Sequence, residues 1–230
     1  STYSPLTIGN ITVYNNNIHA IGSKHSSSIN KHYKYNGSTW TKLDDLPYYY
    51  SDTFSIGVKD NNTPLPVLNN KIYLPTDYNG NGNLQICCYD GSSYTYVSEE
   101  IDKNGDYGYC MTGIDDKLYF SYYSSGTSTF TSYYTVYVYD ISDNTEKIYV
   151  QLQSSSYDNQ LWLFNYNNKL YCITCDMNDV ILIKMNDNLI DTFIEINELD
   201  SKKFTVGYTN YTNYMHFVCT FNNYIYIIYS

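Results

Sequence analysis

The stretch Asn17-Ile18-His19 decides the fold, because close copies of it return four more times along the chain. The copies are Asn70-Lys71-Ile72-Tyr73, Asp116-Lys117-Leu118-Tyr119, Asn168-Lys169-Leu170-Tyr171 and Asn223-Tyr224-Ile225-Tyr226. The apolar residue of the motif stands at positions 18, 72, 118, 170 and 225, which are 54, 46, 52 and 55 residues apart. A period near fifty, built from short strands and Asn- or Gly-rich turns, is typical of a β-propeller or a similar array. Each unit alone cannot bury its apolar face, so we expect the units to stack.

A second motif follows half a unit behind the first and divides each unit into four strands. Tyr35-Asn36, Tyr89-Asp90, Tyr139-Asp140 and Met185-Asn186 each end an alternating apolar run and begin a turn. In the first two units the turn continues as Gly37-Ser38-Thr39-Trp40 and Gly91-Ser92-Ser93-Tyr94, a hairpin turn before an aromatic strand residue. The predicted strands are 8–14, 17–22, 31–35 and 39–46; 65–69, 71–75, 84–89 and 94–99; 109–114, 117–122, 133–139 and 147–152; 160–166, 169–174, 179–185 and 190–197; and a last pair, 213–221 and 224–229.

These patterns predict an all-β protein: a small β-propeller forming a single domain over residues 1–230, with about five blades, the last of them irregular. The 31 tyrosines among 230 residues agree with this, because tyrosine favours half-buried pleated surfaces. We expect residues 2–7 to add an outer strand to the last blade and so to close the ring. The alternative is that the chain is part of a longer protein.

The charge balance argues against nucleic acid as a partner. The net charge is −10, and the 13 lysines are scattered singly in a chain without arginine, whereas phosphate backbones are held by clustered Lys and Arg. The same balance disfavours adhesion to anionic lipid. Since no apolar run approaches the length of a membrane span, no membrane insertion is expected either.

The cysteines, the histidines and one aspartate loop are the candidates for a metal or redox site. The six cysteines lie in predicted strands or directly at the end of one, and they are interpreted as buried free thiols, with an inter-strand disulfide as the alternative: Cys87, Cys88, Cys110, Cys172, Cys175 and Cys219. The four histidines match no zinc pattern and are interpreted as exposed or partly buried polar strand residues: His19, His25, His32 and His216. The loop Asp77-x-Asn79-x-Asn81-Gly82 fits the first half of a calcium loop but lacks its final glutamate, which favours an ordinary turn. No metal or cofactor is therefore expected.

Residues 13–47 resemble a kelch repeat, in which a turn before an apolar strand is followed by a Tyr-Asp-like turn and a strand tryptophan, here Trp40. The glycine doublet of that repeat is absent, and only Gly22 stands at its place. Asn- and Tyr-rich units of this kind look like the kelch-type propellers in receptor-binding proteins of phage tails and phage-tail-like bacteriocins from low-GC Gram-positive bacteria. The resemblance implies a location in a virion or extracellular tail particle, contacts with other tail proteins, and recognition of a glycan or protein receptor on a bacterial cell. It also implies a core position for Trp40, while Trp162 is a candidate to line the central channel.

An enzyme is the main alternative to a binding module. Gly37-Ser38-Thr39-Trp40 matches the last half of the sialidase element Ser-x-Asp-x-Gly-x-Thr-Trp, but Tyr33 and Tyr35 occupy the Ser and Asp places, and the chain has no arginine to clamp a carboxylate. Other glycosidases need two carboxylates about 5–10 Å apart. Nothing in the spacing of the candidates singles out such a pair: Asp102, Asp106, Asp115 and Asp116. We therefore predict a non-catalytic protein and keep a carbohydrate-active enzyme, or a structural domain of a larger assembly, as alternatives.

Loop length predicts which face of the propeller binds. In an up-and-down sheet, the turns between strands 1 and 2 and between strands 3 and 4 lie on one face, and these turns are short. The connections on the opposite face are long: 23–30, 76–83, 122–132 and 175–178 within units, and 47–64, 101–108, 153–159 and 198–212 between them. Binding functions collect on long loops of a rigid scaffold.

The tyrosines outside the strand pattern fall in these long loops, and they are the candidate ligand-binding residues: Tyr48, Tyr49, Tyr50, Tyr78, Tyr107, Tyr122, Tyr123, Tyr157, Tyr208 and Tyr211. Tyrosine with Asn, Ser and Gly forms adaptable recognition surfaces, since it offers a large contact area at small entropic cost and a hydroxyl group for hydrogen bonds. The alternative is that tyrosine is simply a habitual surface residue of this protein. We predict that the long-loop face binds a receptor and that the short-turn face does not.

Overall fold

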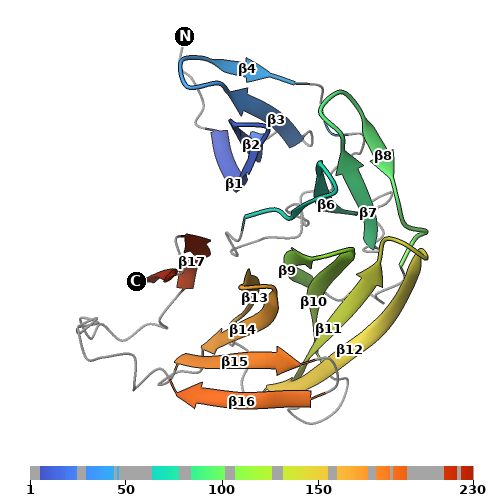
Figure 1. The fold of residues 1–230 in the computed structure, drawn as a ribbon, viewed down its shortest axis with the longest axis vertical. Helices are drawn as coiled ribbons and strands as arrows, with labels where there is room; N and C mark the ends of the chain where they lie inside the picture. The colour runs from blue at the N-terminus through green and yellow to red at the C-terminus, as the bar shows by residue number, and fades with distance from the viewer. Residues whose placement is uncertain are drawn as a thin grey trace.

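The computed structural model describes the backbone of residues 6–24, 30–43, 46, 64–77, 84–101, 107–125, 132–154, 160–175, 180–186, 189–195, 215–221 and 224–229. Every regular element in these ranges is a β-strand, and they include no helix that could span a membrane. The strands form four four-stranded antiparallel sheets and one two-stranded sheet. Within each sheet, neighbours in space are also neighbours in sequence, so each sheet is one blade built as an up-and-down meander (Figure 1).

The blades match the predicted units in number, order and strand content. Blade 1 contains β1 (Leu6–Tyr14), β2 (Asn17–Lys24), β3 (Asn30–Tyr35) and β4 (Trp40–Lys42). Blade 2 contains β5 (Val67–Leu68), β6 (Lys71–Asp77), β7 (Leu84–Tyr89) and β8 (Tyr94–Tyr96). Blade 3 contains β9 (Tyr107–Ile114), β10 (Lys117–Ser125), β11 (Ser132–Asp140) and β12 (Thr145–Ser154). Blade 4 contains β13 (Gln160–Tyr166), β14 (Lys169–Cys175), β15 (Val180–Asn186) and β16 (Leu189–Glu195), and the last sheet pairs β17 (Met215–Phe221) with β18 (Tyr224–Tyr229).

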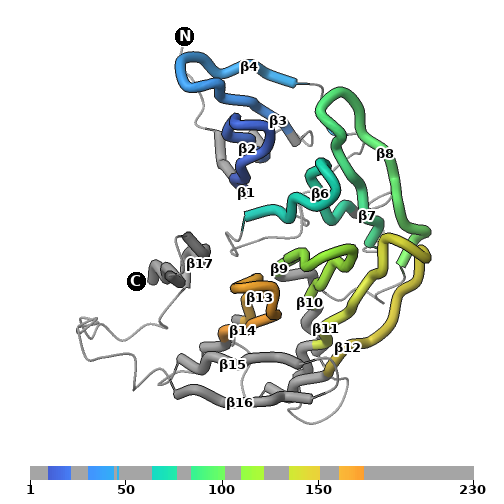
Figure 2. The backbone as a smooth tube through the Cα atoms, viewed as in Figure 1, coloured from blue at the N-terminus to red at the C-terminus, as the bar shows by residue number. Residues whose placement is uncertain are grey.

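The sheets are arranged radially. Figures 1 and 2 show β1, β9 and β13 toward the middle of the molecule, with β4, β8 and β12 at its rim. The fold is a β-propeller.

Asparagine pairs make the turns between the first two strands of three blades. The φ angles are 48° and 57° at Asn15 and Asn16, 48° and 55° at Asn69 and Asn70, and 52° and 55° at Asn167 and Asn168. Two consecutive residues with positive φ form the tight hairpin turn whose twist matches that of the flanking strands, and asparagine tolerates this backbone better than most residues. The repeated asparagine motif therefore encodes the β-hairpin that begins each of these blades.

The turn between the third and fourth strands of a blade is held by its own first side chain. Asn36 Oδ1 accepts hydrogen bonds from the backbone N–H groups of Ser38 and Thr39 at 3.0 and 2.9 Å. Asp90 Oδ1 does the same for Ser92 and Ser93, both at 2.8 Å. Since these bonds stabilise the ionised carboxylate, they lower the pKa of Asp90 to about 2.

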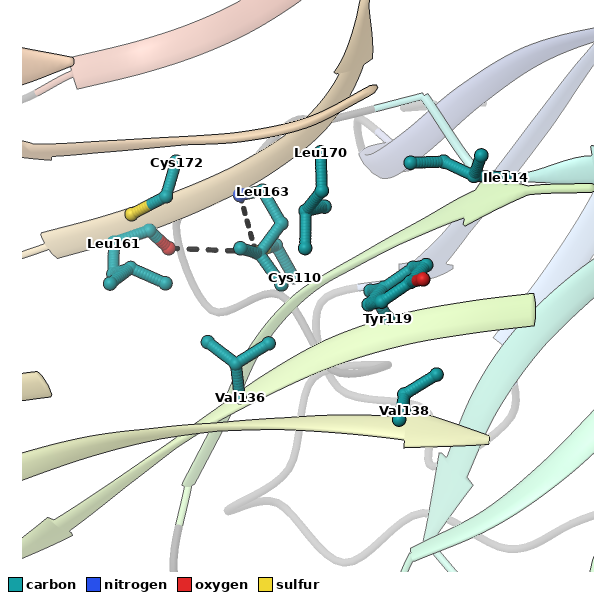
Figure 3. Close-up of a cluster of buried hydrophobic side chains, with 9 residues drawn as sticks. All are labelled: Cys110, Ile114, Tyr119, Val136, Val138, Leu161, Leu163, Leu170 and Cys172. Carbon is teal, nitrogen blue, oxygen red and sulfur yellow. Dashed lines mark hydrogen bonds between the residues drawn. The ribbon is translucent and has the colours of Figure 1, made fainter. Parts of the chain in front are cut away.

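Neighbouring blades bury the apolar residue of the repeated motif between them. Ile72 lies in the cluster between blades 1 and 2, Leu118 in the cluster between blades 2 and 3, and Leu170 in the cluster between blades 3 and 4. In each case the motif residue faces the preceding blade. Figure 3 shows the third cluster, where Leu161 and Leu163 of β13 point toward blade 3. Stacking of the units, as the sequence predicted, buries one apolar cluster between each two successive blades from blade 1 to blade 4.

The first blade presents an apolar row that the described residues leave uncovered. Val13 pairs with Ile18, Ile18 with Tyr35, and Tyr35 with Trp40, so that the four side chains cross the sheet on one face. The exposed fractions are 66% for Val13, 38% for Ile18 and 51% for Trp40. The prediction that Trp40 is a core residue is therefore wrong. Its ring packs on Tyr35, with 5.0 Å between the ring centroids, on a face without a described neighbouring blade.

Two further expectations concern the inner strands. Trp162 is fully buried, and its Nε1 has no hydrogen-bond partner in the described part of the chain. It alternates with Leu161 and Leu163 along β13 and so lies on the opposite face of blade 4, where β13 contacts β17.

Leu6 and Thr7, expected in an outer strand of the last blade, instead pair with Lys24 and Ser23 within blade 1. Residues 2–5 lie outside the described residues.

Candidate functional site

The structure places three of the ten candidate tyrosines in strands. β9 begins at Tyr107, and β10 continues through Tyr122 and Tyr123 to Ser125, so the prediction that these three lie in loops is wrong. Tyr123 pairs with Tyr107 on one side and with Tyr134 on the other. Tyrosine favours pleated surfaces, and this explains why the ladder extends past the predicted strand ends. The other candidates lie outside the described residues: Tyr48, Tyr49, Tyr50, Tyr78, Tyr157, Tyr208 and Tyr211. The same holds for Asn79, Asn81 and Gly82 of the aspartate loop.

The connections divide between two edges of the blades. Because adjacent strands are antiparallel, the connections β1–β2 and β3–β4, and their counterparts in other blades, leave at one edge, which we name the turn edge. The opposite edge, which we name the loop edge, receives the connections β2–β3 and those between blades. Turn-edge connections are as short as Asn15-Asn16, whereas 43–66, 97–106 and 196–214 connect successive blades at the loop edge.

Hydrogen bonds join the turn edges of successive blades, so these edges share one face of the molecule. The Tyr14 hydroxyl group lies 2.9 Å from the carbonyl oxygen of Asn70 and 2.8 Å from that of Asp90. Asn69 Nδ2 donates to Asp116 Oδ1 at 2.7 Å. The turn edge is therefore a compact surface whose turns are hydrogen-bonded to one another. The long connections all leave from the other side of the described scaffold.

One groove lies at the turn edge of blade 3, and the sequence analysis did not predict it. Its volume is about 420 Å³, and its walls include Lys117 and Tyr119 of β10, Asp140 of β11, and Lys147 and Tyr149 of β12. Asp143, in the turn between β11 and β12, completes the rim. Three strands and a turn supply these side chains, so no local motif marks the groove. It is a candidate binding site.

The two aspartates of the groove are held by their turn. Asp140 Oδ1 accepts hydrogen bonds from Ser142 Oγ at 2.6 Å and Ser142 N at 3.0 Å, and Asp143 Oδ1 accepts one from Thr145 N at 3.0 Å. The hydroxyl and N–H groups of Ser142, together with the nearby charge of Lys117, lower the pKa of Asp140. Both carboxylates are thus fixed in direction.

A buried polar network joins blades 1 and 2, and it includes His19 and His32, for which the expectation of an exposed or partly buried position is wrong. His19 Nδ1 lies 2.8 Å from His32 Nε2, and His32 Nδ1 is hydrogen-bonded to the hydroxyl group of Tyr94. Burial, followed by the proximity of His19, lowers the pKa of His32 to about 3. Burial and the charge of Lys34 also lower the pKa of His19. Both imidazoles are therefore neutral near pH 7, and the network acts as a structural contact between two blades.

The cysteine thiols with described side chains are free and buried, as predicted: Cys87, Cys88, Cys110 and Cys172. Cys110 accepts a hydrogen bond from the backbone N–H of Leu163 at 2.9 Å across the interface shown in Figure 3. Burial raises the pKa of Cys87 to about 12 and that of Cys110 to about 11, so these thiols stay protonated and unreactive. Within the described residues, no three His, Cys, Asp or Glu side chains converge as a metal site.

The comparisons with known proteins concern the fold. No protein-family model matches the chain, and no match was found among curated proteins. Among solved structures, the chain is similar to the β-propeller domain of Nup133 from Vanderwaltozyma polyspora, with a TM-score of 0.50, 12% identity and coverage of 95% of this chain and 68% of that one.

Two further solved structures were matched. An exo-β-1,3-galactanase from Phanerochaete chrysosporium gives a TM-score of 0.51 at 9% identity, over 96% of this chain and 55% of that one. This chain thus spans about half the length of the galactanase. YCF48 bound to a D1 peptide gives a TM-score of 0.43 at 9% identity, over 97% of this chain and 76% of that one. At such identities the likeness concerns the fold alone.

Proposed function

We propose that the protein is a non-catalytic binding module that recognises a glycan or protein receptor on a bacterial cell surface. In this proposal it works outside the cell, as a kelch-like part of a phage or bacteriocin tail, beside other tail proteins. No cofactor, nucleic acid or membrane insertion takes part. The loop edge carries the contact with the receptor.

The observation that carries the proposal is the contrast between the two edges. At the turn edge, two-residue turns such as Asn15-Asn16 and Asn167-Asn168 close the hairpins, and hydrogen bonds connect the turns of neighbouring blades. The chain places its long, tyrosine-containing connections at the other edge, including 43–66 and 196–214. A rigid scaffold with long segments at one side suits adaptable recognition.

Binding to target cells tests the proposal. Replacing Tyr48, Tyr49 and Tyr50 together by Ala should weaken cell binding at least tenfold, since one well-packed aromatic contact contributes about 1–3 kcal/mol at a hot spot. The matched control is Asn36→Ala at the turn edge, which removes the hydrogen bonds to Ser38 and Thr39 and should leave cell binding unchanged. If only the Asn36→Ala control lost cell binding, the receptor would bind at the turn edge and the proposal would be wrong.

The alternative function, a carbohydrate-active enzyme, predicts a different readout. Incubation of the protein with purified cell-wall polysaccharide, and with β-1,3-galactan as the substrate type of the galactanase, is followed by chromatography of the soluble fraction. A pure binding module releases no saccharide from either polymer. Catalytic release of sugar would replace the proposed function by a hydrolytic one.

A further inference from the structure

We propose that the groove at the turn edge of blade 3 is a second binding site, and that it takes a neutral saccharide. This site is separate from the loop edge, on which the proposed function relies. Its side chains come from β10, β11, β12 and the turn after β11.

The strand register builds the groove on one face of the sheet. Lys117 pairs with Asp140, Tyr119 pairs with Val138, and Val138 pairs with Lys147, so their side chains stand in adjacent rows. The buried pair of this set, Tyr119 and Val138, forms the floor, with exposed fractions of 6% and 3%. Lys117 and Lys147 are exposed and form the rim. The groove therefore has an apolar base and a polar rim.

An aromatic ring of β12 lies on the same face, because Tyr149 is two residues beyond Lys147 in the strand. The register between β11 and β12 shifts, with Val136 paired to Val150 and Tyr137 paired to Ile148, so that Tyr149 is the extra residue. Tyr149 and Val150 both pack against the cluster between blades 3 and 4 as a result. The ring of Tyr149 meets that of Tyr119 edge-on, with 5.3 Å between centroids and 86° between planes. The half-buried Tyr149 ring forms a wall of the groove.

The charges around the groove favour a ligand without net charge. Two lysines, Lys117 and Lys147, and two aspartates, Asp140 and Asp143, line the groove together. A ligand of either sign would meet like charges, each of which disfavours binding. A hydroxyl group, in contrast, donates to a carboxylate and accepts from an ammonium group. The rim thus matches a molecule that carries many hydroxyl groups.

The ring and the volume complete the match. A sugar has apolar C–H faces that can lie against Tyr149 while its hydroxyl groups reach the lysines and aspartates. The volume of about 420 Å³ is within the range of small-molecule sites, roughly 300–1,000 Å³. Because hydrogen bonds already fix the two carboxylates, these two side chains lose little conformational entropy when a ligand binds.

Saturation-transfer NMR on the full chain tests the proposal, with glucose, galactose, cellobiose and lactose as neutral probes and glucuronate and glucosamine as charged probes. At least one neutral sugar should bind, and at least tenfold more tightly than either charged sugar. The proposal is wrong if no neutral sugar binds, or if a charged sugar binds as well as the best neutral one.

Variants locate the binding in the groove. Lys147→Ala removes an exposed rim ammonium group and should weaken sugar binding at least tenfold with an unchanged unfolding curve. The matched control is Lys169→Ala, an exposed lysine at the repeat position equivalent to Lys117 but in blade 4, and it should bind as the parent does. Tyr149→Ala should abolish binding and Tyr149→Trp should restore it. Equal binding by the Lys147 and Lys169 variants would refute the site, even if the Tyr149 variants fail to fold.

Discussion

Tyr14 and Gly91 meet at the seam between blades 1 and 2, and this contact can be measured with two glycine variants. Gly37 and Gly91 occupy equivalent turns with φ angles of 97° and 104°, so alanine introduces comparable backbone strain at both. A Cβ atom at Gly91 would lie 3.2 Å from the Tyr14 hydroxyl oxygen, whereas at Gly37 it would meet nothing within 4 Å. We therefore expect Gly91→Ala to destabilise the fold by about 1–2 kcal/mol more than Gly37→Ala in urea unfolding. Equal losses would mean that the seam adapts without cost.

Acid should weaken the same seam through His32. Its pKa is about 3 in the folded protein and near 6.5 in an unfolded chain, so below pH 6.5 the unfolded state binds more protons. Stability is then lost as the pH falls from about 6.5 toward 3, by about 2 kcal/mol between pH 7 and pH 5 from His32. His19, whose pKa is also lowered, acts in the same direction.

The test compares the parent protein with His32→Gln in urea unfolding at pH 7 and pH 5. We expect the variant to be less stable at pH 7, because the hydrogen bonds of His32 to His19 and Tyr94 are altered, and to lose less stability on acidification, because one proton-linked group has been removed. Identical pH dependence in both proteins would show that His32 does not titrate during unfolding.

At the level of elements, the inner strands of blades 2 and 3 approach closely at Gly113. A Cβ atom there would lie 2.8 and 2.9 Å from Leu68 Cδ1 and Cγ and 3.0 Å from Pro66 Cβ. Gly113→Ala should force β5 and β9 apart and cost about 1–3 kcal/mol in thermal or urea unfolding. The double variant Gly113→Ala with Leu68→Ala should recover part of the loss, and an additive result would contradict the proposed clash.

The strands were predictable because hydrophobic alternation and turn chemistry agree along most of the chain. Asn15-Asn16 and Asn69-Asn70 place hairpins from sequence alone, because few residues adopt two positive φ angles. Strand lengths were less predictable. β5 is confined to Val67–Leu68, while β10 extends to Ser125, since pairing partners in the neighbouring strand decide where a ladder stops.

The candidate site depended on information that no single segment carries. The groove needs the pairing of Lys117 with Asp140 and of Val138 with Lys147, and both are properties of the register between adjacent strands. The exposure of Trp40 also could not be predicted from its own strand. Its strand position and aromatic character predicted burial, yet the outcome depended on which blade covers that face of the sheet.

At the scale of the whole molecule, the uncovered row on blade 1 implies a gradient of local unfolding. Blade 3 has a buried cluster on each side, one with Leu118 and one with Val138. Blade 1 has a buried cluster on one side and the exposed row with Val13 and Trp40 on the other. In a linear stack of repeats, a unit with one interface opens more easily than a unit with two. Native-state hydrogen exchange should therefore be fast at the amides of β2 and β3 and slow at those of β10 and β11. Equal exchange rates in the two blades would mean that the blades open together and would contradict the gradient. We expect the stack to unfold first at blade 1, so that the contact of His19 and His32 with blade 2 is lost before the contacts of blade 3.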